Sequence, residues 1–376
     1  MKKILITGGA GFIGSYLCEK LYDLGYEIIL LDNLSQQIHP NYEGSFLQKK
    51  VAGKAQLIKG DVANKDDWRK ALEGVEAVVH LAAETGTGQS MYEIERYYKV
   101  NVLGTSLLLD ILVNETHSVK KIVIASSRAI YGEGKYKDAD GMIHFPLERR
   151  EEEMSKKIFE PINTSTGELL QMVSTDEDAM LHPSSIYGLT KLAQEQMIML
   201  MGKQLKIPSV ALRFQNVYGP GQSLSNPYTG LLAVFSNRIR GNKPLDIYED
   251  GRETRDFVYI DDVVESIILS LTKAKADDEV FNIGSGVATP ILKVAELMCR
   301  FFKQDVPITI SGNYRIGDIR HNCADIAKAQ KLLGFQPKIS FEEGLAKFVE
   351  WVNVQEMVED KYDASVAEIK AKGLMK

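Results

Sequence analysis

The chain has 376 residues and a formal net charge of −6, and its 44% hydrophobic and 26% charged residues are typical of a globular protein with a sizeable core. The negative charge argues against nucleic-acid binding through a positive surface, and no stretch approaches the ~20 apolar residues of a membrane-spanning helix. Cys18, Cys299 and Cys323 lie far apart without CxxC spacing, so we expect neither a disulfide framework nor a metal site. A cytoplasmic protein in a reducing compartment is the simplest interpretation.

Short apolar runs alternate with helical patterns through the first half of the chain, as they do in βαβ units. The apolar runs predict strands over Lys3–Thr7, Glu27–Leu31, Gln56–Lys59, Ala77–His80, Lys121–Ser126 and Ser209–Phe214. Helical periodicity predicts helices over Phe12–Leu24, Tyr92–Leu112 and Ile186–Met201. This order predicts an α/β fold with a doubly wound parallel sheet of the Rossmann type.

Two segments depart from this alternation. The polar, charged stretch 133–182 is predicted to be an insert that forms a surface lobe or a lid. Because the alternation fades after Phe214, we expect a dinucleotide-binding domain over 1–214 and a smaller substrate-binding lobe over 215–376. The charged stretch after Trp351 is predicted to be a solvated helical tail and not part of the core.

A glycine-rich turn follows the first predicted strand. Gly8, Gly11 and Gly14 form G-x-x-G-x-x-G, within which Phe12 and Ile13 open a helix. Such glycines permit a tight turn, close approach of a pyrophosphate and close packing of helix on sheet, while the helix N-terminus offers free N–H groups. An ordinary βα turn is the alternative, because a glycine-rich turn alone is weak evidence.

An acidic residue at the end of the second predicted strand strengthens the case for a dinucleotide. Asp32, followed by Asn33, stands where a carboxylate can accept both hydroxyls of an adenosine ribose. The carboxylate would repel a 2′-phosphate, and no Arg or Lys occurs within 33–37 to offset that repulsion. The expected cofactor is therefore NAD and not NADP.

Two further segments follow predicted strands and fit the same site. Asp61-Val62 can flank the adenine, although an Asp after a strand is equally a helix cap. Leu81-Ala82-Ala83 offers small side chains where the backbone must lie against the cofactor. With these segments the βαβ pattern indicates a dinucleotide site.

Three polar residues are candidates for catalytic groups. Tyr187 and Lys191 stand at i and i+4 of a predicted helix and share one face. Ionising a phenol of pKa ~10 at neutral pH costs roughly 4 kcal/mol, and a nearby ammonium favours the phenolate. Ser127 lies at the carboxyl end of a predicted strand, the edge at which doubly wound sheets bind ligands. A surface Tyr–Lys pair and a turn-forming serine are the structural alternatives.

Together these motifs resemble the extended short-chain dehydrogenase/reductase family of NAD-dependent nucleotide-sugar epimerases and dehydratases. The resemblance rests on the glycine turn, Asp61-Val62, Leu81-Ala82-Ala83, Ser127 ahead of Tyr131-Gly132, and Tyr187-x-x-x-Lys191. It implies that Tyr187 is the general base and that Lys191 binds the nicotinamide ribose and lowers the pKa of Tyr187. It also implies that Ser127 polarises the substrate oxygen.

The resemblance continues in the second half of the chain. Asn216 lies in Phe214–Pro220, which resembles the family segment whose asparagine contacts the sugar diphosphate. Arg255 and Arg315 resemble the two diphosphate-binding arginines of the family, a role that the fork geometry of Arg suits. Arg320 lacks such a match, and we interpret it as part of a surface salt bridge.

One departure from the family narrows the expected reaction. Ser127-Arg128-Ala129 stands where the family's 4,6-dehydratases carry Thr-Asp-Glu, and Arg128 and Ala129 cannot supply the acid and base that expel water. We therefore expect an epimerase that inverts C4 through a transient 4-keto sugar, with Ser127 and Arg128 facing the substrate. The alternatives are a nucleotide-sugar 4-oxidase or 4-reductase with net redox, and a non-catalytic NAD-binding protein on the same fold.

Two segments, 84–93 and 219–230, resemble the dTDP-L-rhamnose 4-epimerase branch of this family, which also carries a long insert before the tyrosine. That resemblance implies a dTDP-L-rhamnose/dTDP-6-deoxy-L-talose substrate pair. Family members pair helices into a four-helix bundle, which implies a homodimer through 92–112 and 186–201. The expected partners are a nucleotide-diphosphate sugar and a second copy of the chain, with no nucleic acid and no membrane.

Overall fold

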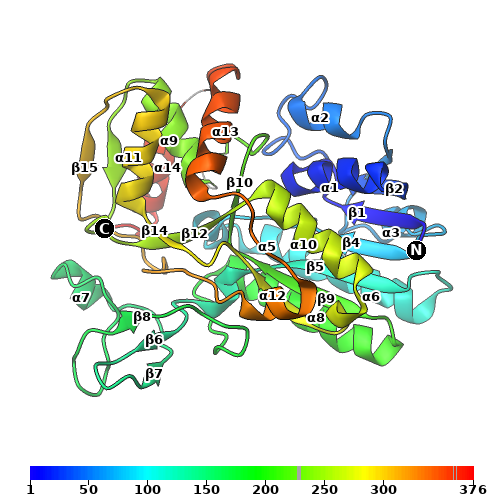
Figure 1. Cartoon of the computed structure of the whole chain (residues 1–376), viewed down its shortest axis with the longest axis horizontal. Coiled ribbons are helices and arrows are strands. Elements are labelled where there is room, and N and C mark those ends of the chain that lie inside the picture. The colour runs from blue at the N-terminus through cyan, green and yellow to red at the C-terminus, as the bar shows by residue number, and fades with distance from the viewer. Residues whose placement is uncertain (227–229, 359, 361) are drawn as a thin grey trace.

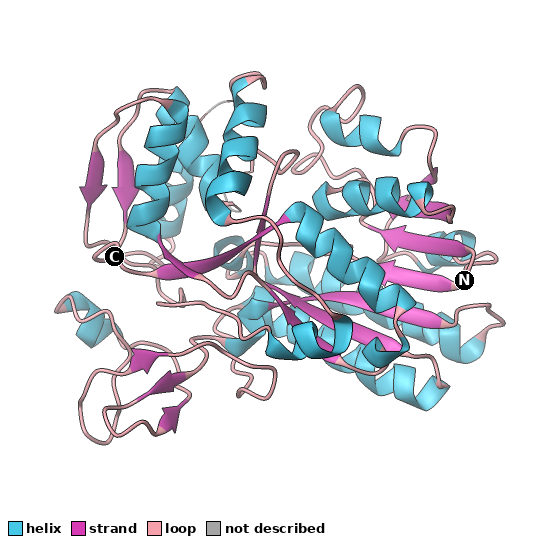
Figure 2. Ribbon diagram, in the orientation of Figure 1, coloured by secondary structure: helices cyan, strands magenta, loops and turns pink. Residues whose placement is uncertain are grey.

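The structure is a computed structural model, and it describes residues 1–226, 230–358, 360 and 362–376. Its central sheet has seven strands in the order β13-β9-β5-β4-β1-β2-β3, and every neighbouring pair is parallel. Helices cover both faces of this sheet (Figure 1 and Figure 2), so the predicted Rossmann-type sheet is confirmed. The strands are β1 (Lys3–Thr7), β2 (Glu27–Asp32), β3 (Gln56–Lys59), β4 (Ala77–His80), β5 (Lys121–Ser127), β9 (Ser209–Phe214) and β13 (Val280–Ile283).

Alternate residues of these strands face two separate hydrophobic cores. In β1, Ile4 and Ile6 belong to one buried cluster and Leu5 belongs to the other. Successive side chains of a strand point to opposite faces, so a sheet covered on both sides requires continuous apolar runs. One core includes α1 (Phe12–Asp23) and α10 (Ile260–Thr272), and the other includes α3 (Lys65–Ala71), α6 (Gly104–Asn114) and α8 (Ile186–Leu205).

The predicted helices are confirmed in part. Leu24 is the C-cap of α1 and Gly25 follows it with φ +83°, so α1 ends where the periodicity predicted. The helix predicted over 92–112 is present from Ile94 to Asn114 but is not regular, because a π-helical turn over Tyr98–Leu103 joins α5 (Ile94–Tyr97) to α6. A π-turn inserts one residue per turn, so the apolar stripe shifts around the helix axis at this point.

A smaller lobe follows β9. Its short sheets pair β10 (Asn216–Tyr218) with β12 (Thr254–Tyr259) and β14 (Ala288–Pro290), and β11 (Leu245–Ile247) with β15 (Ile308–Ile310). Its helices are α9 (Leu231–Arg240), α11 (Ile291–Phe302), α13 (Phe341–Asn353) and α14 (Tyr362–Ala371). The division expected at residue 214 does not follow the main sheet, because α10, β13 and α12 (Ala327–Leu333) return to it and β13 pairs with β9.

The insert 133–182 forms a small body of its own beside the lobe (Figure 1). Its elements are β6 (Tyr136–Lys137), β7 (Ile143–His144), α7 (Glu151–Ser155) and β8 (Gln171–Met172), with the strands antiparallel in the order β7-β6-β8. Arg149 pairs with Glu133 at 2.9 Å and with Glu249 of the lobe at 2.8 Å, and all three side chains are buried. Buried charges therefore anchor the insert to the lobe.

The end of the chain differs from the prediction of a solvated tail. Ile369 of α14 and Met375 near the terminus are buried, with exposed fractions of 5% and 4%. Val354 and Met357 of the same stretch are exposed, so the stretch is solvated in its first part and docked in its last. In the described part of the chain, no helix has the length and apolar character needed to span a membrane.

Candidate active site

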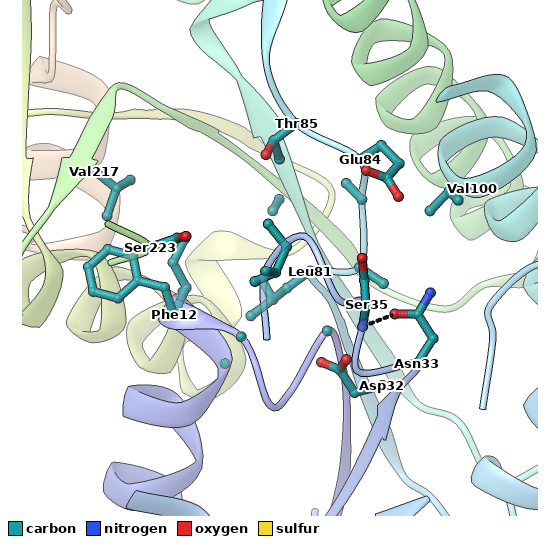
Figure 3. Close-up of a pocket in the computed structure, with 18 of the residues that line it drawn as sticks. Phe12, Asp32, Asn33, Ser35, Leu81, Glu84, Thr85, Val100, Val217 and Ser223 are labelled. Carbon is teal, nitrogen blue, oxygen red and sulfur yellow. Dashed lines mark hydrogen bonds between the residues drawn. The ribbon is translucent and has the colours of Figure 1, made fainter. Parts of the chain in front are cut away.

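A cavity of about 430 Å³ lies where the carboxyl ends of β1, β2, β4 and β5 meet. In Figure 3, Phe12, Val217 and Ser223 lie on one side of Leu81, and Asn33 and Ser35 lie on the other. The residues expected from the sequence to bind the cofactor all line it: Gly8, Gly11, Phe12, Ile13, Gly14, Asp32, Asn33, Asp61, Val62, Leu81, Ala82, Ala83, Tyr187 and Lys191. The fold thus brings five separate sequence segments to one surface.

The glycine turn depends on contacts that a side chain would prevent. Gly8 has φ +66°, and a Cβ there would lie 2.9 Å from the backbone nitrogen of Ala82. A Cβ on Gly14 would lie 2.5 Å from the carbonyl oxygen of Gly8, so α1 packs directly on the end of β1. Gly11 caps α1 without a side-chain hydrogen bond, which leaves N–H groups of the first turn available to phosphate oxygens. The turn therefore fits a dinucleotide pyrophosphate.

Asp32 holds its carboxylate at the cavity wall. Its Oδ2 accepts from the Ala10 N–H at 3.0 Å, and its Oδ1 accepts from the Leu34 N–H at 2.9 Å. Nε2 of His39 lies 3.9 Å away, and burial lowers the pKa of His39 although Asp32 opposes that shift, so the imidazole is neutral at physiological pH. No lysine or arginine among the described residues pairs with Asp32, which suits ribose hydroxyls and not a 2′-phosphate.

The sequence left open whether Asp61 contacts the cofactor or caps a helix, and the structure gives it features of both roles. Its Oδ1 accepts from the Ala63 N–H at 2.8 Å and so stabilises the turn before α3. The N-cap of α3 itself is Asn64, whose side chain accepts from two backbone N–H groups of the first turn. Since Asp61 also lines the cavity, its remaining lone pairs are available to a ligand.

Ser127, Tyr187 and Lys191 meet at the same cavity. Ser127 ends β5, and its Oγ accepts from the Ala129 N–H at 3.2 Å. Tyr187 lies in the first turn of α8, whose N-cap Ser185 accepts from a backbone N–H of that turn. Burial raises the pKa of Tyr187, and hydrogen bonding to Ser127 and the charge of Arg128 oppose that shift.

The structure adds a positive charge near Tyr187 that the sequence did not indicate. Lys191 donates from Nζ to Oε1 of Gln194 at 2.8 Å, and burial lowers the pKa of Lys191 to about 7. The cation that lowers the pKa of the Tyr187 phenol is instead Arg128, the residue after Ser127. The expected effect of Lys191 on this phenol therefore stays a prediction.

Three arginines gather around the carboxylate of Asp318. Burial raises the pKa of Asp318, but the charges of Arg255, Arg315 and Arg128 outweigh burial and hold that pKa below its usual value. Arg255 pairs with Asp318 at 3.2 Å, and its remaining hydrogen bonds go to backbone carbonyls of the lobe. The charge of Arg149 acts on Asp318 as well, and the buried carboxylate of Glu133 acts on Arg128 and Arg255, so the cluster mixes arginines with buried carboxylates.

Arg128 and Arg315 are the members of this cluster with unused donors. Within the described residues the Arg128 side chain has no hydrogen bond or ion pair, and burial together with Arg255 lowers its pKa to about 10. Arg315 donates from Nη2 to the hydroxyl of Tyr248 at 3.3 Å, and its buried Nε has no partner in the part of the chain that the structure describes. Desolvated guanidinium groups of this kind favour an anionic ligand.

The other two residues singled out in the second half have different surroundings. Asn216 begins β10, and its Oδ1 accepts from Nδ2 of Asn322 at 3.4 Å. Arg320 is not on the surface as the sequence suggested, because only 1% of its side chain is exposed. It pairs with Glu160, Glu249 and Asp250 at 2.7, 2.9 and 2.7 Å, so its role is structural.

Sequence reasoning missed two polar side chains that hold the Tyr187 region. Oγ of Ser90 accepts from the Tyr187 N–H at 3.0 Å. The buried amide of Asn101 accepts from the Glu84 N–H at 2.8 Å and donates to the Thr190 hydroxyl at 3.0 Å. A buried asparagine within an apolar helical stripe was the signal available for Asn101, which lies in the π-turn.

Loops supply further cavity residues that no local pattern marks. The segment after β2 contributes Ser35, Gln37, Ile38 and His39, and the lobe contributes Gly221, Gln222, Ser223 and Gly230. The two groups of residues are far apart in the chain. Only the folded structure shows that both line the cavity. Within the segment 219–230 that suggested a branch of the family, Pro227, Tyr228 and Thr229 lie outside the described residues.

This geometry defines a class of protein. A Rossmann-type sheet whose glycine turn, carboxylate and Ser–Tyr–Lys group line one cavity is typical of NAD-dependent enzymes of the extended short-chain dehydrogenase/reductase type. The family model described as "NAD dependent epimerase/dehydratase family" matches residues 4–284. The chain belongs to this family.

Two similar proteins carry the names of nucleotide-sugar epimerases. The chain is 40% identical over 353 residues to the dTDP-L-rhamnose 4-epimerase of Burkholderia thailandensis, covering 93% of this chain and 95% of the relative. It is 30% identical to a putative UDP-glucose 4-epimerase of Methanocaldococcus jannaschii, covering 93% and 98% of the two chains. These similarities support an NAD-dependent enzyme of the nucleotide-sugar epimerase group.

The fold is also similar to that of a solved nucleotide-sugar epimerase. The UDP-glucuronic acid 4-epimerase from Bacillus cereus, in complex with UDP-glucuronic acid and NAD, matches with a TM-score of 0.76 at 27% identity. The match covers 93% of this chain and 99% of that one. The cofactor of this family is NAD, and the glycine turn and Asp32 of this chain fit it.

Proposed function

We propose that this chain is a C4 epimerase of a nucleotide-diphosphate sugar, of the dTDP-L-rhamnose/dTDP-6-deoxy-L-talose type. The observation that carries the proposal is the meeting of Ser127, Tyr187 and Lys191 at the cofactor cavity, next to Arg128 and Ala129. An acid pair in place of Arg128 and Ala129 would be needed for dehydration. The 40% identity to a dTDP-L-rhamnose 4-epimerase supports the choice of nucleotide and sugar.

In this mechanism, Tyr187 takes the proton of the C4 hydroxyl while Ser127 donates a hydrogen bond to the same oxygen. NAD, which the glycine turn of Gly8, Gly11 and Gly14 and the carboxylate of Asp32 would hold, would supply reversible hydride acceptance at C4 when bound. The 4-keto sugar turns within the site between the two transfers, so that hydride returns to its opposite face and Tyr187 gives the proton back to the oxygen. General acid–base catalysis of this kind contributes typically ~10²–10⁴-fold to a rate.

The charge of Arg128 assists the proton transfer. Burial raises the pKa of Tyr187, which disfavours the phenolate, and Arg128 and Ser127 lower it. Lys191 is proposed to hold the nicotinamide ribose, because its Nζ is buried at the cavity beside Gln194. In this proposal Arg128 acts on the Tyr187 phenol, and Lys191 orients the cofactor.

The arginine cluster is proposed to bind the diphosphate. Arg128 and Arg315 have unused donors, Arg255 is locked in place by Asp318, and Asn216 lies on the neighbouring strand β10. A diphosphate would accept hydrogen bonds from the unused donors of Arg128 and Arg315 and replace the hydration that these guanidinium groups lose. Diphosphate binding at the lobe would hold the sugar between the lobe and Tyr187.

The test uses the protein as purified, with its bound cofactor and without added NAD. We expect dTDP-L-rhamnose to be converted to an equilibrium mixture with its C4 epimer, read by NMR, and we expect slower or no conversion of UDP-, GDP- and CDP-sugars. Sustained production of NADH would contradict the epimerase and support the 4-oxidase or 4-reductase.

The matched variant is Tyr187→Phe, which removes only the phenol oxygen. Turnover is expected to fall by roughly 10²–10⁴-fold while bound NAD is retained. Full turnover by this variant would contradict the assigned chemistry. No turnover of any nucleotide sugar by the unmodified protein would support the non-catalytic alternative.

A homodimer is part of the proposal. Exposed apolar side chains lie on the two helical segments expected to pair, with Tyr98 and Leu103 on the π-turn and Leu189 and Leu200 on α8. Burying such residues against a second copy would remove them from water. Light scattering is expected to give a dimer mass for the unmodified protein and a monomer mass for Leu200→Lys.

A cytoplasmic location completes the proposal. Cys18, Cys299 and Cys323 are all free thiols, as suits a reducing compartment. Cell fractionation in the source organism is the measurement, and recovery of the protein outside the cytoplasmic fraction would contradict it.

A further inference from the structure

The last residues of the chain pair with the segment that carries Arg315. The Tyr314 N–H donates to the Lys376 carbonyl at 3.0 Å, and the Ile316 N–H donates to the Leu374 carbonyl at 3.0 Å. Arg315 and Met375 form an antiparallel bridge between these bonds. The backbone on both sides of Arg315 is therefore held by the C-terminus.

A chain of hydroxyl groups connects α14 to the Arg315 guanidinium. Nη2 of Arg315 donates to the Tyr248 hydroxyl at 3.3 Å, and the hydroxyls of Tyr248 and Tyr362 lie 2.7 Å apart. The guanidinium also lies 5.0 Å from the centre of the Tyr248 ring. Burial raises the pKa of Tyr362, so its hydroxyl remains protonated at any pH the enzyme meets.

This arrangement orients Arg315 without neutralising it. Tyr248 occupies one face and one donor of the guanidinium, but no carboxylate among the described residues lies within ion-pair distance of Arg315. Its Nε is buried and has no partner in the described part of the chain. A desolvated cation held by a neutral partner keeps its full charge for an anionic ligand.

The same C-terminal segment also reaches the part of the chain that lines the cofactor cavity. The end of the Ile369 side chain lies against Gly88, in the short helix Thr87–Ser90 beside Ser90. Nζ of Lys372 lies 4.4 Å above the ring of Tyr92. The segment therefore joins the lobe to the loop that supports Tyr187.

A third contact ties the terminus to the insert. Nζ of Lys376 pairs with Oε1 of Glu151 in α7 at 2.8 Å. The lobe, the cofactor loop and the insert thus all contact the segment 362–376.

We propose that the C-terminal segment 362–376 is a component of the substrate site, in which Tyr362 and the strand 374–376 position Arg315 to bind the diphosphate of a nucleoside diphosphate. The inference rests on the proposed function, because it assigns the ligand of Arg315 to that substrate class. Tyr362 is a positioning residue that acts through Tyr248. Loss of its hydroxyl frees the Tyr248 hydroxyl to rotate, and the guanidinium then loses its fixed orientation.

The experiment measures binding of dTDP to the NAD-containing protein by calorimetry. We expect Tyr362→Phe to weaken dTDP binding by about five- to tenfold, as expected for loss of one hydrogen bond that orients a charged group. Removal of residues 374–376 is expected to weaken binding further. In both variants KM for the sugar nucleotide should rise while kcat and bound NAD stay near the unmodified values.

Asp363→Asn is the matched control. Asp363 is the next residue of α14 and pairs with Arg238 at 2.9 Å, away from the Tyr248 hydroxyl. This variant is expected to lose part of the docking energy of α14 and to keep its dTDP affinity. Weakening of dTDP binding by Asp363→Asn to the same extent as by Tyr362→Phe would contradict a specific effect through Tyr248.

The outcomes separate the two proposals. If the unmodified protein does not bind dTDP or UDP, the proposed function fails. If it binds dTDP and both Tyr362→Phe and removal of 374–376 leave the affinity unchanged, the proposed function stands and the role of the C-terminal segment is overturned. Because Tyr362→Phe keeps the aromatic ring over which Arg238 lies at 4.6 Å, folding is expected to be preserved and thermal unfolding checks it.

Discussion

Arg315 and Arg320 belong to one short segment, but their electrostatic surroundings are opposite. Arg320 is enclosed by the carboxylates of Glu160, Glu249 and Asp250, so its charge is fully compensated within the protein. Arg315 has a tyrosine hydroxyl and a tyrosine ring as its partners. Compensated charges in a protein interior hold the structure together, and uncompensated charges at a site are available to a ligand. The difference separates structural from functional arginines here.

The largest effect on stability is expected for Arg320→Met. Removing the cation leaves the buried carboxylates of Glu249 and Glu253 with less compensation and takes the partner from Asp250, which costs about 3–5 kcal/mol of unfolding free energy. Urea unfolding measures this loss. The control is Arg252→Met, an exposed arginine of the same region, which should change the unfolding free energy by less than about 0.5 kcal/mol. A small effect of Arg320→Met would contradict the structural assignment.

Arg315→Gln is expected to weaken ligand binding and to leave stability almost unchanged. The unfolding free energy should change by less than about 1 kcal/mol, because Arg315 forms no direct ion pair and Asp318 keeps its pairing with Arg255. Binding of dTDP should weaken by about 10- to 100-fold, the range for loss of a hydrogen bond between charged groups. Calorimetry and urea unfolding on the same preparation test both halves. Equal losses of stability by the two variants would remove the distinction between Arg315 and Arg320.

Arg128→Gln tests the second uncompensated arginine through pH. Because burial raises the pKa of Tyr187 and Arg128 lowers it, removing the charge should leave the phenol pKa higher. The phenolate then forms at higher pH, so the acidic limb of the kcat/KM profile should move upward by up to about one pH unit. An unmoved limb, with Arg252→Gln as the control, would show that Arg128 does not act on Tyr187.

The smallest expected effect concerns the pH dependence of stability and involves Glu253, a buried carboxylate 3.8 Å from Arg320. Burial raises the pKa of Glu253 to about 7, from a usual value of 4.5. Above pH 7, Glu253 is ionised in the folded protein, and its buried charge lowers the free energy of unfolding. This loss disappears as the pH falls toward 4.5, where the carboxyl is protonated in the folded protein. Glu253→Gln should stabilise the protein by about 1–2 kcal/mol more at pH 8 than at pH 5. Urea unfolding at the two pH values checks it, and an equal effect at both would contradict the raised pKa.

The fold and the cofactor half of the site were predictable because their signals are local. Six strands of the main sheet were predicted with boundaries within one residue, since apolar runs and flanking glycines mark buried parallel strands. The seventh strand, β13, was not predicted, because its run Val280–Ile283 is short and lies within the lobe sequence. Pairing with β9 decides its position, and that pairing spans distant parts of the chain.

The substrate half was less predictable. The sequence indicated Arg255 and Arg315 equally, but the structure shows Arg255 bound to Asp318 and backbone carbonyls and Arg315 without an acidic partner. The π-turn at Asn101 and the docking of Met375 also had no recognised local signal. Both features depend on contacts with distant segments: Asn101 contacts Glu84 and Thr190, and Met375 pairs with Arg315.

The sequence by itself determined the Rossmann-type sheet, the glycine turn and the positions of Ser127, Tyr187 and Lys191, because steric demands and side-chain periodicity act between near neighbours. Only the tertiary structure decided which arginines are compensated, and it alone revealed that the C-terminal segment holds Arg315. Burial and charge compensation are properties of the whole fold, since they depend on partners brought together from distant parts of the chain.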